Sequence, residues 1–160
     1  MSVEETLQTG LALVAEWSLE TTEPEPNRID VVIDVEKLIG AVTALQQGHW
    51  GYLSAITGLD LGVEAGQLEV LYHFCNGAAV LTLRVRISRD DAHVPSVYGV
   101  IPSVSFYERE LIEMFGVTVD GTPNTDRLFL PDDWPEGVYP LRKDFNIKNA
   151  QSPVQREEQR

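Results

Sequence analysis

The segment Leu68–Ile87, LEVLYHFCNGAAVLTLRVRI, predicts the centre of the fold. Its second half alternates apolar and polar side chains from Leu81 to Ile87, a pattern typical of a strand with one buried and one solvated face. Its first half, Leu68–Phe74, places every second apolar residue on one side in the same way. The dipeptide Asn76-Gly77 between the halves favours a tight turn. We therefore predict an antiparallel β-hairpin here.

The sequence on either side of this hairpin predicts further strands and helices. A preceding strand is expected over residues 52–61, and the β-branched run at residues 29–33 predicts another. Apolar residues at helical spacing predict helices over residues 3–18, 34–48 and 105–115. This order of elements predicts an α+β domain: a mostly antiparallel sheet of about four strands with flanking helices.

Local signals predict where these helices begin and end. The proline-containing stretch 21–27 is expected to end the first helix, and Asp34 can cap the second. Ser105 and Glu108 have the spacing of a capping box, in which each side chain bonds the backbone at the other residue. Gly116 suits the end of the third helix.

The character of the chain changes after Gly116. Prolines stand at positions 123, 131, 135, 140 and 153, which disfavours regular helices and long paired strands. Large apolar residues nevertheless occur here, too many for a free tail. We predict three parts: an α+β domain at 1–116, an extended proline-rich segment at 117–146 that docks on a partner, and a mobile polar tail at 147–160.

The composition excludes several classes of function. A formal net charge of −13 has the wrong sign for binding nucleic acid. A single cysteine, Cys75, permits no internal disulfide and indicates a reducing compartment. No apolar run approaches the roughly 18 residues of a membrane span, and Glu4 and Glu5 stand where a signal peptide needs basic residues. We expect a cytoplasmic protein that reaches a membrane only through a partner.

Motifs for chemistry are sparse. The chain has no glycine-rich phosphate-binding motif and no nucleophile motif around a serine or Cys75. The soft ligands are His49, His73, His93 and Cys75, and no second close pair accompanies His73 and Cys75 to complete a zinc site. A small metal-binding module therefore stays as an alternative, while Cys75 as a core residue is the simpler interpretation.

The third helix carries dense charge at Glu108, Arg109, Glu110 and Glu113. One interpretation is a solvated face, with Arg109 and Glu113 paired one turn apart. A second is a pair of carboxylates in acid–base catalysis. A third, which we favour, is a set of ion pairs with Arg142-Lys143-Asp144 that holds the extended segment or a partner in register.

Four blocks of the second half, taken together, resemble a known family. The blocks are His93-Val-Pro-Ser-Val97, Glu108-Arg-Glu-Leu-Ile-Glu-Met-Phe-Gly116, Arg127-Leu-Phe-Leu-Pro-Asp-Asp-Trp134 and Pro140-Leu-Arg-Lys-Asp-Phe145. In order and spacing they resemble the 30 kDa subunit family of respiratory complex I.

This resemblance implies a role in assembly. It implies a non-catalytic subunit in the peripheral arm of a proton-pumping NADH:quinone oxidoreductase, on the cytoplasmic side, supporting electron transfer to quinone. Such a subunit has no flavin, iron–sulfur cluster or quinone chemistry of its own, so no cofactor and no activity of the chain alone are expected. Its implied partners are a 49 kDa-type subunit, which resembles hydrogenase large subunits, and a neighbouring cluster-bearing subunit.

The form of the last block adds an alternative. Trp134-Pro-Glu-Gly-Val-Tyr-Pro-Leu-Arg-Lys-Asp-Phe145 resembles the version in energy-converting membrane-bound nickel–iron hydrogenases and formate hydrogenlyases. In either complex we expect no catalytic, cofactor-binding or metal-binding residue in this chain. The residues predicted to dock on partners are Glu108, Arg109, Glu110, Glu113, Phe129, Trp134, Tyr139, Arg142, Lys143, Asp144 and Phe145.

Overall fold

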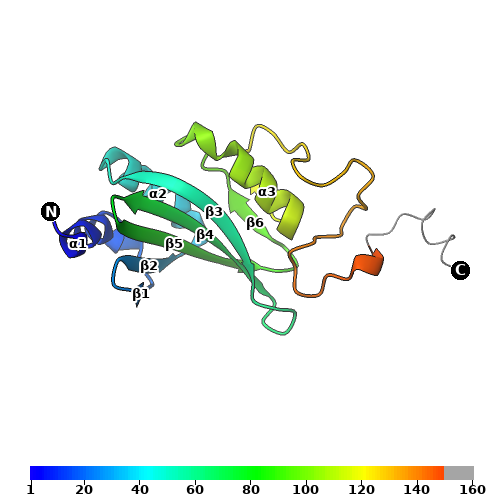
Figure 1. The fold of residues 1–160 in the computed structure, drawn as a ribbon, viewed down its shortest axis with the longest axis horizontal. Helices are drawn as coiled ribbons and strands as arrows, with labels where there is room; N and C mark the ends of the chain where they lie inside the picture. Colours follow the sequence, from blue (N-terminus) through cyan, green and yellow to red (C-terminus); the bar gives the residue numbers. More distant parts are fainter. Residues whose placement is uncertain (150–160) are drawn as a thin grey trace, which may run out of the picture.

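A twisted five-stranded sheet forms the body of the protein in the computed structural model, which describes residues 1–149 (Figure 1). The strands lie in the order β1 (Glu20–Glu25), β2 (Arg28–Ile33), β5 (Ala79–Ser88), β4 (Gln67–Asn76) and β3 (Tyr52–Asp60). Strands β2 and β5 are parallel, and all other neighbours are antiparallel. The prediction of an α+β fold with a mostly antiparallel sheet is confirmed.

The β4–β5 hairpin forms as its sequence predicts. Asn76 pairs with Ala79 across the turn, and Gly77 takes the positive φ of 59° that such a turn needs. Tyr72 and Leu83 face each other on the side of the sheet that carries the hydrophobic core, and both are buried. The register therefore follows from the alternation of apolar residues.

Strand β1 is the fifth strand, which sequence reasoning missed. We expected the stretch 21–27 only to end a helix, because it contains Pro24 and Pro26. In the structure β1 is exposed along its whole length and lies at the edge of the sheet, where a missing N–H costs no ladder hydrogen bond. Its pairing with β2 shifts register between Thr22 and Glu25. Prolines and charges on an edge strand also discourage pairing with other chains.

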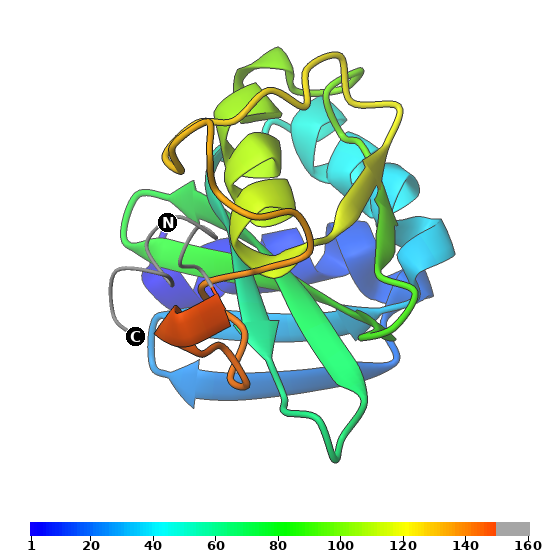
Figure 2. The same ribbon diagram turned by 90° about the vertical axis from the view of Figure 1, so that its right-hand side faces the viewer.

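Helices α1 (Val3–Val14), α2 (Leu38–Gln47) and α3 (Ser105–Phe115) cover the apolar face of the sheet (Figure 2). Their buried side chains, including Val14, Leu45 and Leu111, join the strand residues in one hydrophobic cluster. Within residues 1–149, no helix is both long enough and apolar enough to cross a membrane.

The opposite face of the sheet carries a network of ion pairs. Asp30 and Glu69 are only 1% and 2% exposed. Asp30 accepts hydrogen bonds from Arg28 at 2.6 Å and Arg84 at 3.2 Å, and Glu69 accepts from Arg84 and, at 2.9 Å, from Arg86. Burial acts to raise the pKa of Glu69, but the hydrogen bonds from the two arginines outweigh it and lower that pKa.

Two predicted caps are wrong, and one prediction for a helix end is confirmed. Ser105 is the first residue of α3 and makes no capping hydrogen bond, and Asp34 makes none to the 3-10 turn Val35–Lys37. The side chain of Glu108 instead turns into the protein and accepts from the Ser96 hydroxyl at 2.9–3.0 Å and from the Val97 N–H at 2.9 Å. Gly116 ends α3 with a left-handed φ of 67°, as expected.

A second, two-stranded sheet connects α3 to the rest of the chain. Strand β6 (His93–Pro95) pairs in parallel with β7 (Thr118–Asp120), which follows directly after α3. Val117 and Val119 are buried, so residues 117–120 are part of the packed domain. The segment from 121 to 146, called the C-terminal loop below, then runs over α3 without strand or α-helix (Figure 1). The predicted mobile tail at 147–160 lies, from residue 150 onward, outside the described residues; Ile147–Asn149 form a short 3-10 turn.

Candidate partner-docking site

Glu113 on α3 holds the middle of the C-terminal loop. Its carboxylate accepts hydrogen bonds from three successive backbone N–H groups, those of Leu128 at 3.2 Å, Phe129 at 2.9 Å and Leu130 at 2.8 Å. Bonds to a charged acceptor are stronger than those between neutral groups. The carboxylate therefore fixes a bend in the loop, and the Phe129 side chain at this bend is 63% exposed.

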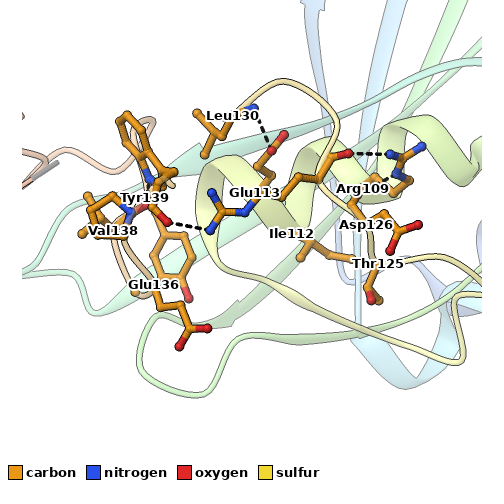
Figure 3. A pocket seen from close by; sticks show the side chains of 13 residues that line it. Arg109, Ile112, Glu113, Thr125, Asp126, Leu130, Glu136, Val138 and Tyr139 are labelled. Atoms are coloured by element: carbon orange, nitrogen blue, oxygen red, sulfur yellow. Dashed lines mark hydrogen bonds between the residues drawn. The ribbon is translucent and has the colours of Figure 1, made fainter. Parts of the chain in front are cut away.

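Arg109, one turn earlier on α3, holds the preceding part of the loop. Its guanidinium donates to the carbonyl of Asp126 at 2.8 Å and to that of Arg127 at 2.7 Å (Figure 3). Arg109 and Glu113 thus bind the loop backbone and do not pair with each other. This geometry fits the interpretation that the helix charges hold the extended segment in place, although they act on backbone groups.

The loop also holds itself through side-chain bonds to its own backbone. Arg127 donates to the carbonyls of Pro131 and, at 2.6 Å, Trp134. The Trp134 indole N–H donates to the Val138 carbonyl at 2.7 Å, and its ring stacks on Phe145 with centroids 6.2 Å apart. These bonds satisfy backbone groups that would otherwise need a helix or sheet.

The end of the loop returns to the C-terminus of α3. The Tyr139 ring lies directly against Gly116, where a Cβ atom would overlap it. The Leu141 N–H donates to the Met114 carbonyl at 3.1 Å, and Arg142 donates from Nε to the Phe115 carbonyl at 2.7 Å. Carbonyls at the end of a helix lack partners within the helix, so these contacts complete it.

A buried ion-pair cluster fastens the end of the loop to the sheet. Asp60, at the end of β3, is 3% exposed and accepts from Arg89 at 3.1–3.2 Å and from the N–H groups of Gly62 and Lys143, both at 2.8 Å. Arg89 also pairs with Asp144. Burial acts to raise the pKa of Asp60, but these hydrogen bonds prevail and lower it to about 2.

The predicted docking residues thus fall into groups with different surroundings. One group lies where α3 meets the C-terminal loop and consists of Arg109, Glu113, Phe129, Trp134 and Tyr139. Glu108 points the other way, into the domain, and Glu110 makes no side-chain hydrogen bond within residues 1–149.

Arg142 and Lys143 were predicted to pair with carboxylates of α3 or with acids of a partner; the pairs with α3 do not form, and pairing with a partner stays a prediction. Among the described residues, neither side chain pairs with Glu108, Glu110 or Glu113. Arg142 donates to a carbonyl and lies over the Tyr139 ring, and Lys143 contributes its backbone N–H. Helix α3 offers the loop end free carbonyls, which accept from Arg142 as a carboxylate would.

Sequence reasoning also missed two residues of the site, Asp60 and Arg89. The spacing of Asp60 and Gly62 is typical of a turn in which an aspartate side chain accepts from the backbone two residues on, so this turn could have been found. The partnership with Arg89 and Lys143 joins positions far apart in the chain, and no local pattern indicates it.

A cavity of about 480 Å³ lies between α3 and the C-terminal loop (Figure 3). Helix α3 contributes Arg109, Ile112 and Glu113, and the loop contributes Thr125, Asp126, Arg127, Leu130 and residues 134–139. The cavity is therefore built from the same elements that carry the predicted docking residues.

The candidate metal ligands His73 and Cys75 are already engaged on the charged face of the sheet. His73 lies 2.9 Å from the Thr57 hydroxyl and 3.0 Å from the Thr82 hydroxyl, and the Cys75 thiol contacts Ser54 at 3.4 Å. Burial, together with nearby arginines, lowers the pKa of His73. Within residues 1–149, no three His, Cys, Asp or Glu side chains are arranged to hold a metal ion.

The fold and this site define a class of protein: an α+β domain whose third helix carries a preformed C-terminal loop. The family model described as the respiratory-chain NADH dehydrogenase 30 kDa subunit matches residues 31–151. The chain belongs to this family.

Curated relatives come from two kinds of complex. The C subunit of NADH-quinone oxidoreductase from Salinispora arenicola is 40% identical over 97 residues, which cover 59% of this chain and 39% of the relative. The C/D subunit of the same type of enzyme from Serratia proteamaculans is 42% identical over 137 residues, 78% of this chain and 23% of the relative. Hydrogenase-4 component G of Escherichia coli is 31% identical over 129 residues, which cover 79% of this chain and 23% of the relative. The matched part therefore spans less than half of the length of these relatives.

A solved structure shows the same fold over nearly the whole chain. A chain of the membrane-bound sulfane sulfur reductase, described as an archaeal respiratory membrane complex, superposes with a TM-score of 0.76 at 23% identity. The match covers 98% of this chain and 91% of the other. At this level of identity the likeness establishes the fold.

Proposed function

We propose that the chain is a non-catalytic structural and assembly subunit in the peripheral arm of a complex I-type NADH:quinone oxidoreductase, where it supports electron transfer to quinone. Membership of the 30 kDa subunit family supports this role. The chain itself binds no redox cofactor and is not an enzyme alone. It lies on the cytoplasmic side and meets the membrane through the complex.

The observation that carries this proposal is the geometry of the C-terminal loop. Side chains of α3 hold its backbone, while Phe129 and Leu141 are 63% and 53% exposed. A loop held in one conformation with apolar side chains directed outward is suited to binding a protein, because little entropy remains to be lost. Of the predicted docking segment 117–146, this proposal assigns docking to residues 121–146, because residues 117–120 belong to the packed domain.

The proposed partner is a 49 kDa-type subunit related to hydrogenase large subunits, next to a cluster-bearing subunit. Two relatives support it, because in the C/D protein and in hydrogenase-4 component G the matched domain is 23% of a longer chain. A domain that is joined to a larger partner in one protein and separate in another commonly contacts that partner in both. The net charge of −13 argues against nucleic acid as a partner.

The alternative is the equivalent subunit of an energy-converting nickel–iron hydrogenase or formate hydrogenlyase, which the likeness to hydrogenase-4 component G favours. Purification of the intact complex through a tag on this chain separates the two. NADH:quinone activity in the purified complex supports the first, and hydrogen or formate oxidation supports the alternative. The third hypothesis, a metal-binding module, has weaker support because His73 and Cys75 gain no further ligand within residues 1–149.

The role in assembly is tested by replacing Phe129 with alanine in the tagged full-length chain. Loss of a buried phenylalanine costs about 1.5–3 kcal/mol, which is roughly a ten- to hundredfold weaker interaction. We expect less of the large partner to co-purify. Tyr52→Ala is the matched control, because Tyr52 is also 63% exposed but lies on β3. Equal retention by Phe129→Ala and wild type, or turnover by the purified chain alone, would contradict the proposal.

A further inference from the structure

The cavity under the C-terminal loop has a chemistry that points to a particular kind of occupant. Its volume of about 480 Å³ lies within the usual range for sites that enclose a small molecule or several side-chain groups. Ile112 and Leu130 give it apolar walls, and the aromatic rings of Trp134 and Tyr139 add to them. Such walls favour the apolar part of a guest.

Some charged side chains around the cavity hold the backbone of the loop, and others have no hydrogen-bond or ion-pair partner in the described part of the chain. Arg109 and Arg127 donate to backbone carbonyls, and Glu113 accepts from three backbone N–H groups, so these three act as supports for the loop. Asp126 and Glu136 also line the cavity, and within residues 1–149 neither carboxylate has a hydrogen-bond or ion-pair partner. Figure 3 shows them on opposite sides of Ile112 in this view. The lining therefore holds two guanidinium groups and three carboxylates, a net charge of −1, and the two carboxylates without a partner among the described residues are the groups left to bind a guest.

We propose that this cavity receives an arginine or lysine side chain from a basic segment of the neighbouring subunit. The inference rests on the proposed function, because it assigns a role to the same loop. Long basic side chains bury an aliphatic stem against apolar surface and keep the charged head among polar groups. Here Ile112, Leu130 and the Tyr139 ring receive the stem, and the charged head is attracted by Asp126 on one side of the cavity and Glu136 on the other.

The net charge of the chain also favours a cationic guest. The chain carries a net charge of −13, which raises the concentration of basic segments near its surface. A metal ion is not favoured, because no three suitable side chains in the described part of the chain converge here.

The direct test is an NMR titration of the full-length chain with the blocked peptide Ac-Gly-Arg-Gly-NH2. We expect chemical-shift changes confined to residues that line the cavity, and none with the matching citrulline peptide, which is neutral and of the same shape. In the double variant Asp126→Asn/Glu136→Gln, affinity for the arginine peptide should fall about fivefold, in line with the loss of attraction to two exposed carboxylates.

The matched control is Asp132→Asn/Asp133→Asn, which removes the same charge from the same loop outside the cavity lining. An equal loss of affinity in the control, or equal binding of the citrulline peptide, would overturn the inference and leave only general attraction to an acidic surface. Co-purification separates this failure from that of the proposed function. If wild type and the Asp126→Asn/Glu136→Gln variant retain equal amounts of partner, the cavity inference alone fails. If wild type retains none, the proposed function fails.

Discussion

Replacing Glu113 with glutamine isolates the contact that fixes the C-terminal loop. One carboxylate oxygen accepts from Leu128 and Leu130, and the other accepts from Phe129. Glutamine can keep the first two bonds through its amide oxygen, but its amide nitrogen would then face the Phe129 N–H, a donor against a donor. The change also removes the negative charge that strengthens the retained bonds.

The expected cost follows from this count of bonds. A hydrogen bond to a charged group contributes about 1.5–3 kcal/mol, and Glu113 is half-buried, so we expect about 1.5 kcal/mol for opening of the loop. This corresponds to roughly tenfold faster hydrogen exchange at the three amides, measured by NMR. Glu113→Ala should have a larger effect, because it removes all three bonds.

The control for this prediction is Glu110→Gln on the same helix, whose side chain makes no hydrogen bond within residues 1–149. Exchange at Tyr72 in the core should be unchanged in both variants, since the loop can open without the sheet. Unchanged exchange at Phe129 in Glu113→Gln, or an equal increase in the Glu110 control, would refute the assignment of Glu113 as the residue that holds the loop.

The remaining predictions concern stability. The pKa of Asp60 is lowered from 3.8 to about 2, so its contribution is present above pH 3.8 and is lost as the pH falls through about 2. In chemical denaturation, Asp60→Asn should show less loss of stability between about pH 4 and pH 2 than wild type, and an identical profile would contradict this. Gly116→Ala should lower the free energy of unfolding by about 1–2 kcal/mol because of its left-handed backbone, and by a further amount because Tyr139 must move. Each kcal/mol should lower Tm by about 2–4 °C. Gly121→Ala shares the positive φ but would meet no atom within 4 Å, so its Tm should fall less, and equal falls would exclude the Tyr139 contact.

Strands and helices whose apolar residues recur with a regular period could be predicted from the sequence. The alternation in Leu68–Ile87 determines which side chains meet the core, and the turn at Asn76-Gly77 determines the register. Strand β1 gives no such signal, because an edge strand whose residues are all exposed needs no apolar alternation and tolerates Pro24. What could not be predicted was pairing across long sequence separations, such as that of β2 with β5.

The capping box at Ser105 failed for a related reason. Its spacing is correct, but a capping role would leave Glu108 at the surface, and the structure buries it to 2% exposure. There its carboxylate accepts from the Val97 N–H, a backbone donor that lies just after strand β6 and would otherwise have no acceptor within residues 1–149. A hydrogen bond that satisfies a buried donor stabilises the protein more than a cap at an exposed helix end. Glu108 therefore bonds to Val97 and does not form the capping box that the sequence predicts.

The three acidic and basic side chains that α3 presents in different directions explain how one short helix serves both the domain and the loop. Glu108 bonds inward to the segment before the helix, while Arg109 and Glu113 bond outward to carbonyls and N–H groups of the C-terminal loop. Ordering a free loop on binding would cost roughly 1–2 kcal/mol for each residue fixed. Because α3 orders the loop before a partner binds, Glu113→Gln should weaken docking even though its carboxylate bonds only to the backbone of the loop.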